Sequence, residues 1–335
     1  AVRSLVRLAA AAGREASDRL LAAAGDLPEE AFVAALHEAV DHAILVPAGG
    51  PGGDLFALRH AVLGETALSQ LVPAERRALH LRLATAIAAD PLLASGGRVT
   101  AAPELAHHWD AAGRAPEAFD ARLVAAAEAE AAHAYADAQQ HLVRALELWG
   151  DLPAGARPAE LDRAELASRA ARVAALAGSP ATAVRLQETA LGELPAEEDA
   201  ARRAAALQQL ASHLSADGRD DEAIATATAA LGAAPADPPT RLRARILATL
   251  GALTMLVGRF REARDLCDEA IAAAAAVGAR DVESQALDYL GVSLVALGDV
   301  EGGIDRLRAA IRIATEVGPL DAALDARNNL GMSLL

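Results

Sequence analysis

The sequence predicts an all-α protein in which a small domain with one β-hairpin precedes a solenoid of helix pairs. Apolar residues make up 53% of the 335 residues but aromatic residues only 2%, so the apolar content is mainly alanine and leucine, which favour helices. Glycine recurs every 40 residues at Gly178, Gly218, Gly258 and Gly298. One glycine-rich loop lies between two short apolar runs in the first hundred residues, as in a hairpin.

The first 97 residues contain this hairpin. Apolar positions at helical spacing predict helices near 3–12, 16–24, 28–42, 59–71 and 74–89. Two short apolar runs, 44–46 and 55–58, flank the glycine-rich loop 47–53. Helices followed by a hairpin are the layout of a winged-helix domain, so we expect such a domain over residues 1–97. Three more helices, with turns at Gly113 and before Asp137, form a connecting segment over 98–150.

Residues 151–335 form the repeated part. A second column of small residues, here called the inner column, also has a spacing of 40: Ala171, Ala211, Gly251, Gly291 and Gly331. Each unit is thus expected to be a helix, a glycine turn and a second helix, because glycine provides the left-handed conformation that ends a helix. Small residues in the inner column let the paired helices approach closely. A unit of this size cannot bury its apolar face alone, so neighbouring units must stack into a solenoid.

These columns resemble the tetratricopeptide repeat, with a small residue in the first helix, alanines in the second helix and a turn between them. The period is longer than the usual 34 residues, and the aromatic residues and terminal proline of that repeat are missing. The last unit stops after its first helix and the chain begins without methionine. We therefore expect the chain to be an internal piece of a longer protein.

Four runs carry a more specific resemblance. They read FALRHAVL at 56–63, LVPAERRALH at 71–80, LAHHW at 105–109 and ALELW at 145–149. In this order they resemble the central region of large ATP-binding LuxR-type transcriptional regulators. In that family a P-loop ATPase module precedes a winged-helix segment, a tetratricopeptide-like sensor arm follows, and a DNA-binding helix-turn-helix ends the chain. The present chain has no lysine and hence no P-loop, so no cofactor is expected in it, and ATP or ADP is implied only for the upstream module.

The resemblance also gives His60 a role. In related ATPases a winged-helix histidine contacts the β-phosphate of the bound nucleotide, and His60, preceded by Arg59, matches that position after the hairpin. The resemblance thus implies that both residues sense the nucleotide of the upstream module. The alternative is that Arg59 and His60 only cap the following helix.

Other candidate sites are weaker. Glu104 and His107 have the spacing of a di-iron motif, but no second copy accompanies them, so His107 and His108 are expected to lie on a helix packing face. Cys267 occupies a position equivalent to Ala227 and Leu307 and is expected to be a core residue. We therefore expect neither a metal site nor enzymatic activity in this chain.

A binding groove is expected along the first helices of the repeats. Helix geometry places the residues at offsets −6, −3, +1 and +4 from the inner column on an exposed face. The candidates are Arg172, Gln208, Arg245, Gln285, Asp288 and Asn328. This polar set of mixed charge suits a protein, a peptide or a small polar effector. It is equally consistent with plain solvated surface.

The charge limits the partners. The net charge is −15, of which residues 101–335 contribute −13, which argues against direct binding to nucleic acid. The apolar run 246–258 is too short to span a bilayer and no signal peptide is evident, so we expect a cytoplasmic protein with no membrane partner. The leading hypothesis is the regulatory and sensor-arm part of an ATP-dependent LuxR-type regulator, which couples effector binding to the nucleotide switch of its upstream ATPase module. The alternative is a scaffold or adaptor that binds a peptide or protein, and self-association is compatible with both.

Overall fold

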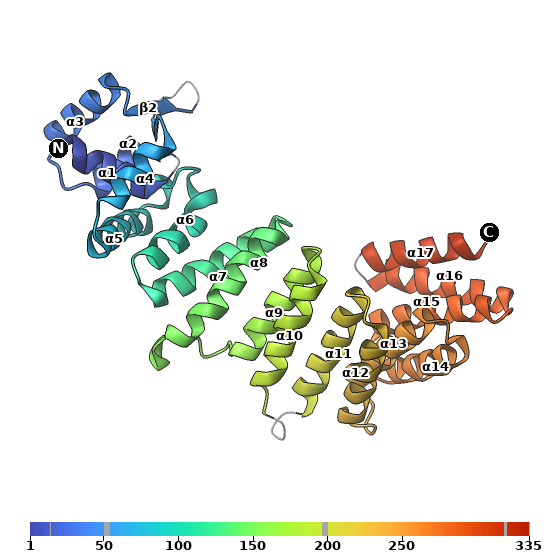
Figure 1. Ribbon diagram of the computed structural model, residues 1–335. Coiled ribbons are helices and arrows are strands. Elements are labelled where there is room, and N and C mark those ends of the chain that lie inside the picture. Colours follow the sequence, from blue (N-terminus) through green and yellow to red (C-terminus); the bar gives the residue numbers. More distant parts are fainter. Residues whose placement is uncertain (14, 50–53, 196–199, 318–319, 335) are drawn as a thin grey trace. The chain divides into compact units, whose positions relative to one another are not determined.

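The computed structural model describes residues 1–13, 15–49, 54–195, 200–317 and 320–334, and most of them are helical (Figure 1). The chain forms two compact units, Ala1–Leu161 and Asp162–Leu335. The first unit includes both the expected hairpin domain, 1–97, and the expected connecting segment, 98–150. The predicted assignment of separate domains to 1–97, 98–150 and 151–335 stays a prediction.

The first unit begins with five helices and a small sheet. The helices are α1 (Val2–Ala12), α2 (Asp18–Ala24), α3 (Glu29–Asp41), α4 (Ala61–Ser69) and α5 (Pro73–Ala89). The strands β1 (Ala16–Ser17), β2 (Leu45–Ala48) and β3 (Leu55–Leu58) form an antiparallel sheet in the order β1-β3-β2. The hairpin of β2 and β3 was predicted, while residues 50–53 of its loop lie outside the described residues. The predicted helix 16–24 instead starts with the short strand β1, and the Ser17 hydroxyl accepts a hydrogen bond from the Leu20 N–H to cap α2.

The core of this part joins helices to the sheet. Leu8 of α1, Leu21 of α2 and Leu83 of α5 are fully buried in one cluster with Leu45 of β2. Each comes from an apolar stripe at helical spacing, except Leu45, which is the inward residue of its strand. Burial of such side chains is the main stabilising contribution, about 1.5–3 kcal/mol for each.

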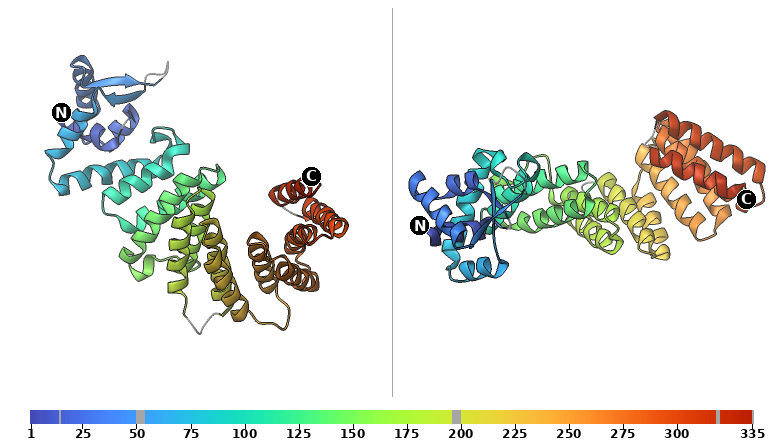
Figure 2. Two further views of the ribbon diagram at one scale, coloured as in Figure 1. Left: turned by 45° about the vertical axis from the view of Figure 1, so that its right-hand side comes forward. Right: turned by 90° about the horizontal axis from the view of Figure 1, so that it is seen from above.

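Three further helices complete the first unit: α6 (Arg98–Ala111), α7 (Ala115–Ala131) and α8 (Tyr135–Leu148). One short 3₁₀ helix, η1 (Pro91–Leu93), precedes α6, and two more, η2 (Trp149–Asp151) and η3 (Ala154–Ala156), follow α8. Helix α5 packs on α6, α6 on α7 and α7 on α8. In Figure 2 these helices form the cyan to green part of the ribbon. Gly113 has a φ of 74° in the turn between α6 and α7, where a side chain would strain the backbone.

The second unit is a tetratricopeptide-like array of helix pairs. Its helices are α9 (Arg163–Leu176), α10 (Pro180–Glu193), α11 (Ala200–Ala216), α12 (Asp220–Ala233), α13 (Arg241–Leu256), α14 (Phe260–Ala276), α15 (Arg280–Ala296), α16 (Val300–Val317) and α17 (Leu320–Ser333). The pairs are α9 with α10, α11 with α12, α13 with α14 and α15 with α16, while α17 packs against α15 and α16. This arrangement confirms the predicted helical repeat.

The glycine columns have the predicted roles. Gly218 and Gly258 each end a first helix with a φ of 77°. In the inner column, a Cβ atom on Gly291 would lie 2.7 Å from Leu307 Cγ and 2.9 Å from the Gly303 carbonyl oxygen, so α15 and α16 meet where only glycine fits. Glycine at this position therefore permits the close helix packing.

Among the described residues, no helix combines the length and the apolar character that a bilayer crossing requires.

Candidate functional site

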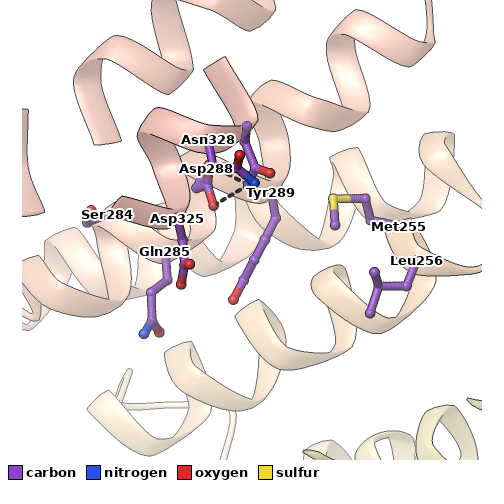
Figure 3. A pocket seen from close by; sticks show the side chains of 9 residues that line it. Met255, Leu256, Ser284, Gln285, Asp288, Tyr289, Asp325 and Asn328 are labelled. Carbon is purple, nitrogen blue, oxygen red and sulfur yellow. Dashed lines mark hydrogen bonds between the residues drawn. The ribbon is translucent and has the colours of Figure 1, made fainter. Parts of the chain in front are cut away.

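A pocket in the second unit lies on the first helices of three successive repeats, α13, α15 and α17 (Figure 3). Its volume is about 270 Å³. The residues that line it are Met255, Leu256, Ser284, Gln285, Asp288, Tyr289, Asp325, Asn328 and Asn329. These residues come together because the 40-residue period stacks equivalent helices beside one another.

A buried carboxylate forms part of this pocket. Asp288 is only 6% exposed, and Asn329 Nδ2 donates to its Oδ1 and Oδ2 atoms at 3.1 and 2.9 Å. Burial raises the pKa of Asp288 to about 6, against the opposing effect of the Asn329 hydrogen bond and with a further increase from Asp325. A carboxylate in these surroundings is stabilised by any positive charge that enters the pocket.

The other side chains give the pocket its polarity. Burial, together with the charges of Asp288 and Asp325, raises the pKa of Tyr289 to about 12, so its hydroxyl keeps its proton at neutral pH. Gln285 and Asp325 are exposed, and their side chains extend to the same side as Tyr289 (Figure 3). None of the nine lining residues is basic. The pocket therefore offers carboxylates, amides and one phenol to a ligand that carries positive charge and hydrogen-bond donors.

The structure brings together three of the six predicted groove residues. Gln285, Asp288 and Asn328 all line this pocket. Arg172 on α9 is exposed and Arg245 on α13 is half-buried, and neither belongs to it. Whether these residues bind a partner stays a prediction.

The expectation that all six are exposed was wrong for three of them: Arg245 is half-buried, and Gln208 and Asp288 are buried. Gln208 is buried, and its Nε2 donates to Thr249 Oγ1 of the next repeat at 2.9 Å. Asp288 is covered in the same manner by Asn329. Both stand at offset −3, and both bond to the residue 41 positions later. The cause is that the first helix of the following repeat covers this position. The geometry of one isolated helix does not reveal this contact.

The predicted groove residues did not include Tyr289, Met255 or Asn329. The signal for Asn329 was present in the repeat period, since offset −3 of one unit meets offset −2 of the next. Tyr289 and Thr249 also stand at offset −2. A search for polar residues 41 positions apart would have found the Asp288–Asn329 pair.

The residues predicted to sense a nucleotide lie in the first unit. Arg59 directly follows β3, and His60 occupies the N-cap position of α4; both are exposed. The His60 side chain makes no capping hydrogen bond, although the residue starts the helix as the alternative interpretation expected. Contact with nucleotide stays a prediction.

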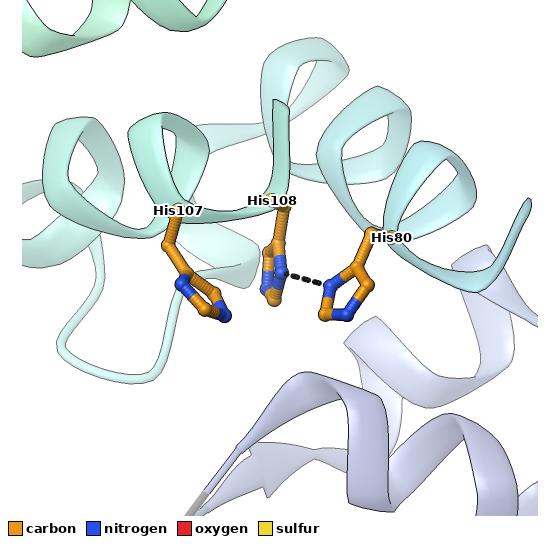
Figure 4. A group of neighbouring side chains, drawn as sticks. All are labelled: His80, His107 and His108. Atoms are coloured by element: carbon orange, nitrogen blue, oxygen red, sulfur yellow. Dashed lines mark hydrogen bonds between the residues drawn. The ribbon is translucent and has the colours of Figure 1, made fainter. Parts of the chain in front are cut away.

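Three histidines of the first unit also approach one another. His80 lies on α5, and His107 and His108 lie on α6 (Figure 4). Burial, with the neighbouring His107, lowers the pKa of His80 to about 4, and burial with both neighbours lowers that of His108 to about 3. The rings of His80 and His108 are therefore neutral at physiological pH. A helix packing face was predicted here from His107 and His108, and His80 was not connected with it.

Cys267 has the surroundings that were predicted for a core residue. It is fully buried on α14, next to Gly251 of the inner column. Burial raises the pKa of its thiol to about 12, with smaller contributions from Asp268 and Asp288. A thiol that stays protonated is a poor nucleophile.

Sequence comparisons do not assign the chain to a family. No model of a known protein family matches the chain. An uncharacterized protein of Rhizobium meliloti (strain 1021) is 30% identical over 151 residues, which are 45% of this chain and 14% of that protein. The chain thus spans about one seventh of the length of that relative.

The chain is also similar to several solved structures. Aspartyl phosphate phosphatase F from Bacillus subtilis has a TM-score of 0.54 and 13% identity, over 81% of this chain and 72% of that one. BtubC from P. vanneervenii has a TM-score of 0.49 and 19% identity, over 65% and 87%. A signal transduction ATPase with a tetratricopeptide repeat sensor from Pyrococcus horikoshii has a TM-score of 0.39 and 12% identity, over 99% and 53%. The likeness to the phosphatase concerns the fold alone.

Proposed function

We propose that the second unit binds a protein partner and holds a cationic side chain of that partner in the pocket around Asp288. The observation that carries this proposal is the buried carboxylate in a pocket without basic residues. A helical repeat presents an extended surface of this kind, on which peptide segments bind.

The energetics favour a lysine or arginine side chain. Ionised Asp288 is poorly solvated, as its raised pKa indicates, so a cation that enters the pocket relieves an existing cost. Asp325 adds a second, exposed carboxylate. The side chains of Gln285 and Asn328 accept hydrogen bonds from a peptide backbone or a guanidinium group.

The test uses a peptide array probed with the full chain, followed by fluorescence anisotropy with the peptides that bind. Peptides that contain Lys or Arg should bind, and Asp325→Lys should weaken their binding at least tenfold. Asp305→Lys is the matched control, because Asp305 is 70% exposed on α16 and does not line the pocket. If both variants bind as the wild type does, the pocket is not the binding site.

A second candidate function is the one that the sequence resemblance implies. We propose that the chain is the regulatory part of an ATP-dependent LuxR-type regulator, in which partner binding on the repeats acts on a nucleotide switch in an upstream module. It is supported by the first unit, where helices precede an antiparallel hairpin as in a winged-helix domain, and by the four sequence runs at 56–149. On this proposal the protein acts in the cytoplasm.

The nucleotide would be held by the upstream module and not by this chain. Arg59 and His60 are exposed donors at the end of the hairpin, so they are accessible to a phosphate that another module binds. We expect neither ATP hydrolysis nor DNA binding from this chain alone. The coding sequence on both sides of it tests the proposal: a P-loop before it and a helix-turn-helix after it are expected, and their absence contradicts the regulator but not the peptide-binding pocket.

A further inference from the structure

The three histidines of the first unit form a compact group of nitrogen ligands. His80 Nδ1 and His108 Nδ1 are 3.1 Å apart, and one nitrogen from each of the three rings lies within 4.8 Å of the others. The ring of His107 lies 5.1 Å from that of His108 and 5.5 Å from that of His80, centroid to centroid. Figure 4 shows the three side chains projecting to the same side of α5 and α6.

The packing of two helices creates this group. His107 and His108 are consecutive on α6 and diverge by about 100° around the helix axis. His108 is 1% exposed and meets His80 of α5, while His107 stays exposed beside them. A hydrogen bond between His80 and His108 explains why these two rings approach each other. It does not explain the position of the His107 ring beside them.

The nearby carboxylates have other partners. Glu104 Oε1 accepts hydrogen bonds from the Ser95 N–H, the Ser95 hydroxyl and the Thr100 hydroxyl at 2.6–2.9 Å. Asp110 is paired with Arg144 and Arg122. The ligand set therefore consists of three imidazoles, which suit zinc and other divalent transition metals.

We propose that His80, His107 and His108 bind a divalent transition metal ion of the zinc type through three imidazole nitrogens, with a fourth position open to solvent. Two nitrogens at the usual distance from a tetrahedral zinc ion are about 3.3–3.4 Å apart, close to the 3.1 Å between His80 and His108. His107 is exposed, and one of its ring nitrogens lies within 4.8 Å of a nitrogen of each of the other two rings.

His80 also lines a cavity of about 480 Å³ whose wall includes Arg76, Arg77 and Asp110. On this proposal, a fourth ligand such as water or a small anion would reach the ion from this cavity. Open positions beside three protein ligands are typical of sites that exchange a fourth ligand, whereas closed four-ligand sites are structural. The site does not depend on the proposed partner pocket, which belongs to the other unit.

The test titrates the chelator-treated full chain with Co²⁺ and Zn²⁺. We expect one equivalent of Co²⁺ to give the visible absorption of a tetrahedral site, and one equivalent of Zn²⁺ to displace it and to raise the Tm. His107→Ala should weaken binding at least tenfold while the circular dichroism spectrum is unchanged, because the side chain is exposed. His80→Ala should have the same effect on binding.

His37→Ala on α3 is the control, since His37 is exposed and lies outside the group. It should bind both metals as the wild type does. The proposal is overturned if the wild type takes up no Co²⁺, if His107→Ala and His80→Ala bind it unchanged, or if His37→Ala abolishes binding.

Discussion

Asn329 donates to both carboxylate oxygens of Asp288, which stands 41 residues earlier on the first helix of the preceding repeat. Gln208 and Thr249 make the equivalent contact two repeats before, again 41 residues apart. These contacts connect the first helices of successive repeats, so they fix one repeat against the next. The Asp288 contact also orients the carboxylate that forms part of the pocket.

Asn329→Leu should destabilise the chain. It leaves a buried carboxylate without its donor, which costs about 1–3 kcal/mol. Urea unfolding at pH 7 measures the change. Asn328→Ala is the control: the neighbouring side chain is exposed, so its loss should change the free energy of unfolding by less than about 0.5 kcal/mol. Equal effects of both substitutions contradict the assigned role of Asn329.

Asp288 should make stability depend on pH in an unusual direction. Its pKa in the folded chain, about 6, lies above that of an unfolded aspartate, so the folded state binds the proton more readily. The contribution of Asp288 to the free energy of unfolding therefore falls as the pH rises from about 4 to 6, by at most about 3 kcal/mol. Tyr289 and Cys267 nearby have pKa values of about 12 and do not titrate in this range.

The difference in unfolding free energy between the wild type and Asp288→Asn reports mainly this effect, since the groups that do not interact with Asp288 cancel. Relative to the variant, the wild type should lose stability between pH 4 and 6. A difference that is constant over this range shows that Asp288 has an ordinary pKa.

Gly291→Ala should destabilise the array by about 1–3 kcal/mol, because the new methyl group would overlap Leu307 and the Gly303 carbonyl. Gly232 on α12 provides a matched helical control: a Cβ atom there meets nothing within 4 Å. Gly232→Ala should be neutral or stabilising by up to about 1 kcal/mol. Thermal unfolding measures both variants. An equal loss of stability in Gly232→Ala would show that tight packing at Gly291 is not the cause.

Asp110→Ala should cost about 2–3 kcal/mol. Asp110 and Arg122 are 18% and 16% exposed, and removal of the carboxylate leaves Arg122 and Arg144 without it. The Arg144 hydrogen bonds hold the pKa of Asp110 below its usual range, against the effect of burial. Its contribution is thus complete at neutral pH and declines as the pH falls through this lowered pKa.

Arg241 forms an exposed ion pair with Asp281 at 2.5 Å and serves as the comparison. Arg241→Ala should change stability by less than about 1 kcal/mol, and less still in high salt. Urea unfolding measures both variants. If Arg241→Ala and Asp110→Ala lower the free energy of unfolding by similar amounts, burial does not make the Asp110 ion pairs the stronger ones.

Much of the fold could be predicted because it depends on local signals. The glycine columns and the alanine positions, such as Ala223 and Ala263, follow the period directly. Strand β1 was missed because two residues are too few to show an alternating pattern. The burial of Asp288 and the approach of His80 to His108 were missed because they depend on packing between helices, which a single helical wheel does not contain.

The central claim is that the Asp288 pocket binds a cationic segment. Calorimetric titration at pH 7.5 and pH 5 tests it most directly, with one Lys- or Arg-containing peptide that binds in the peptide-array experiment. Only the ionised form of Asp288 attracts the cation, so binding should be about tenfold weaker at pH 5. Asp288→Asn should bind weakly at both pH values. Wild-type affinity that is the same at both values and is retained in Asp288→Asn would contradict the claim.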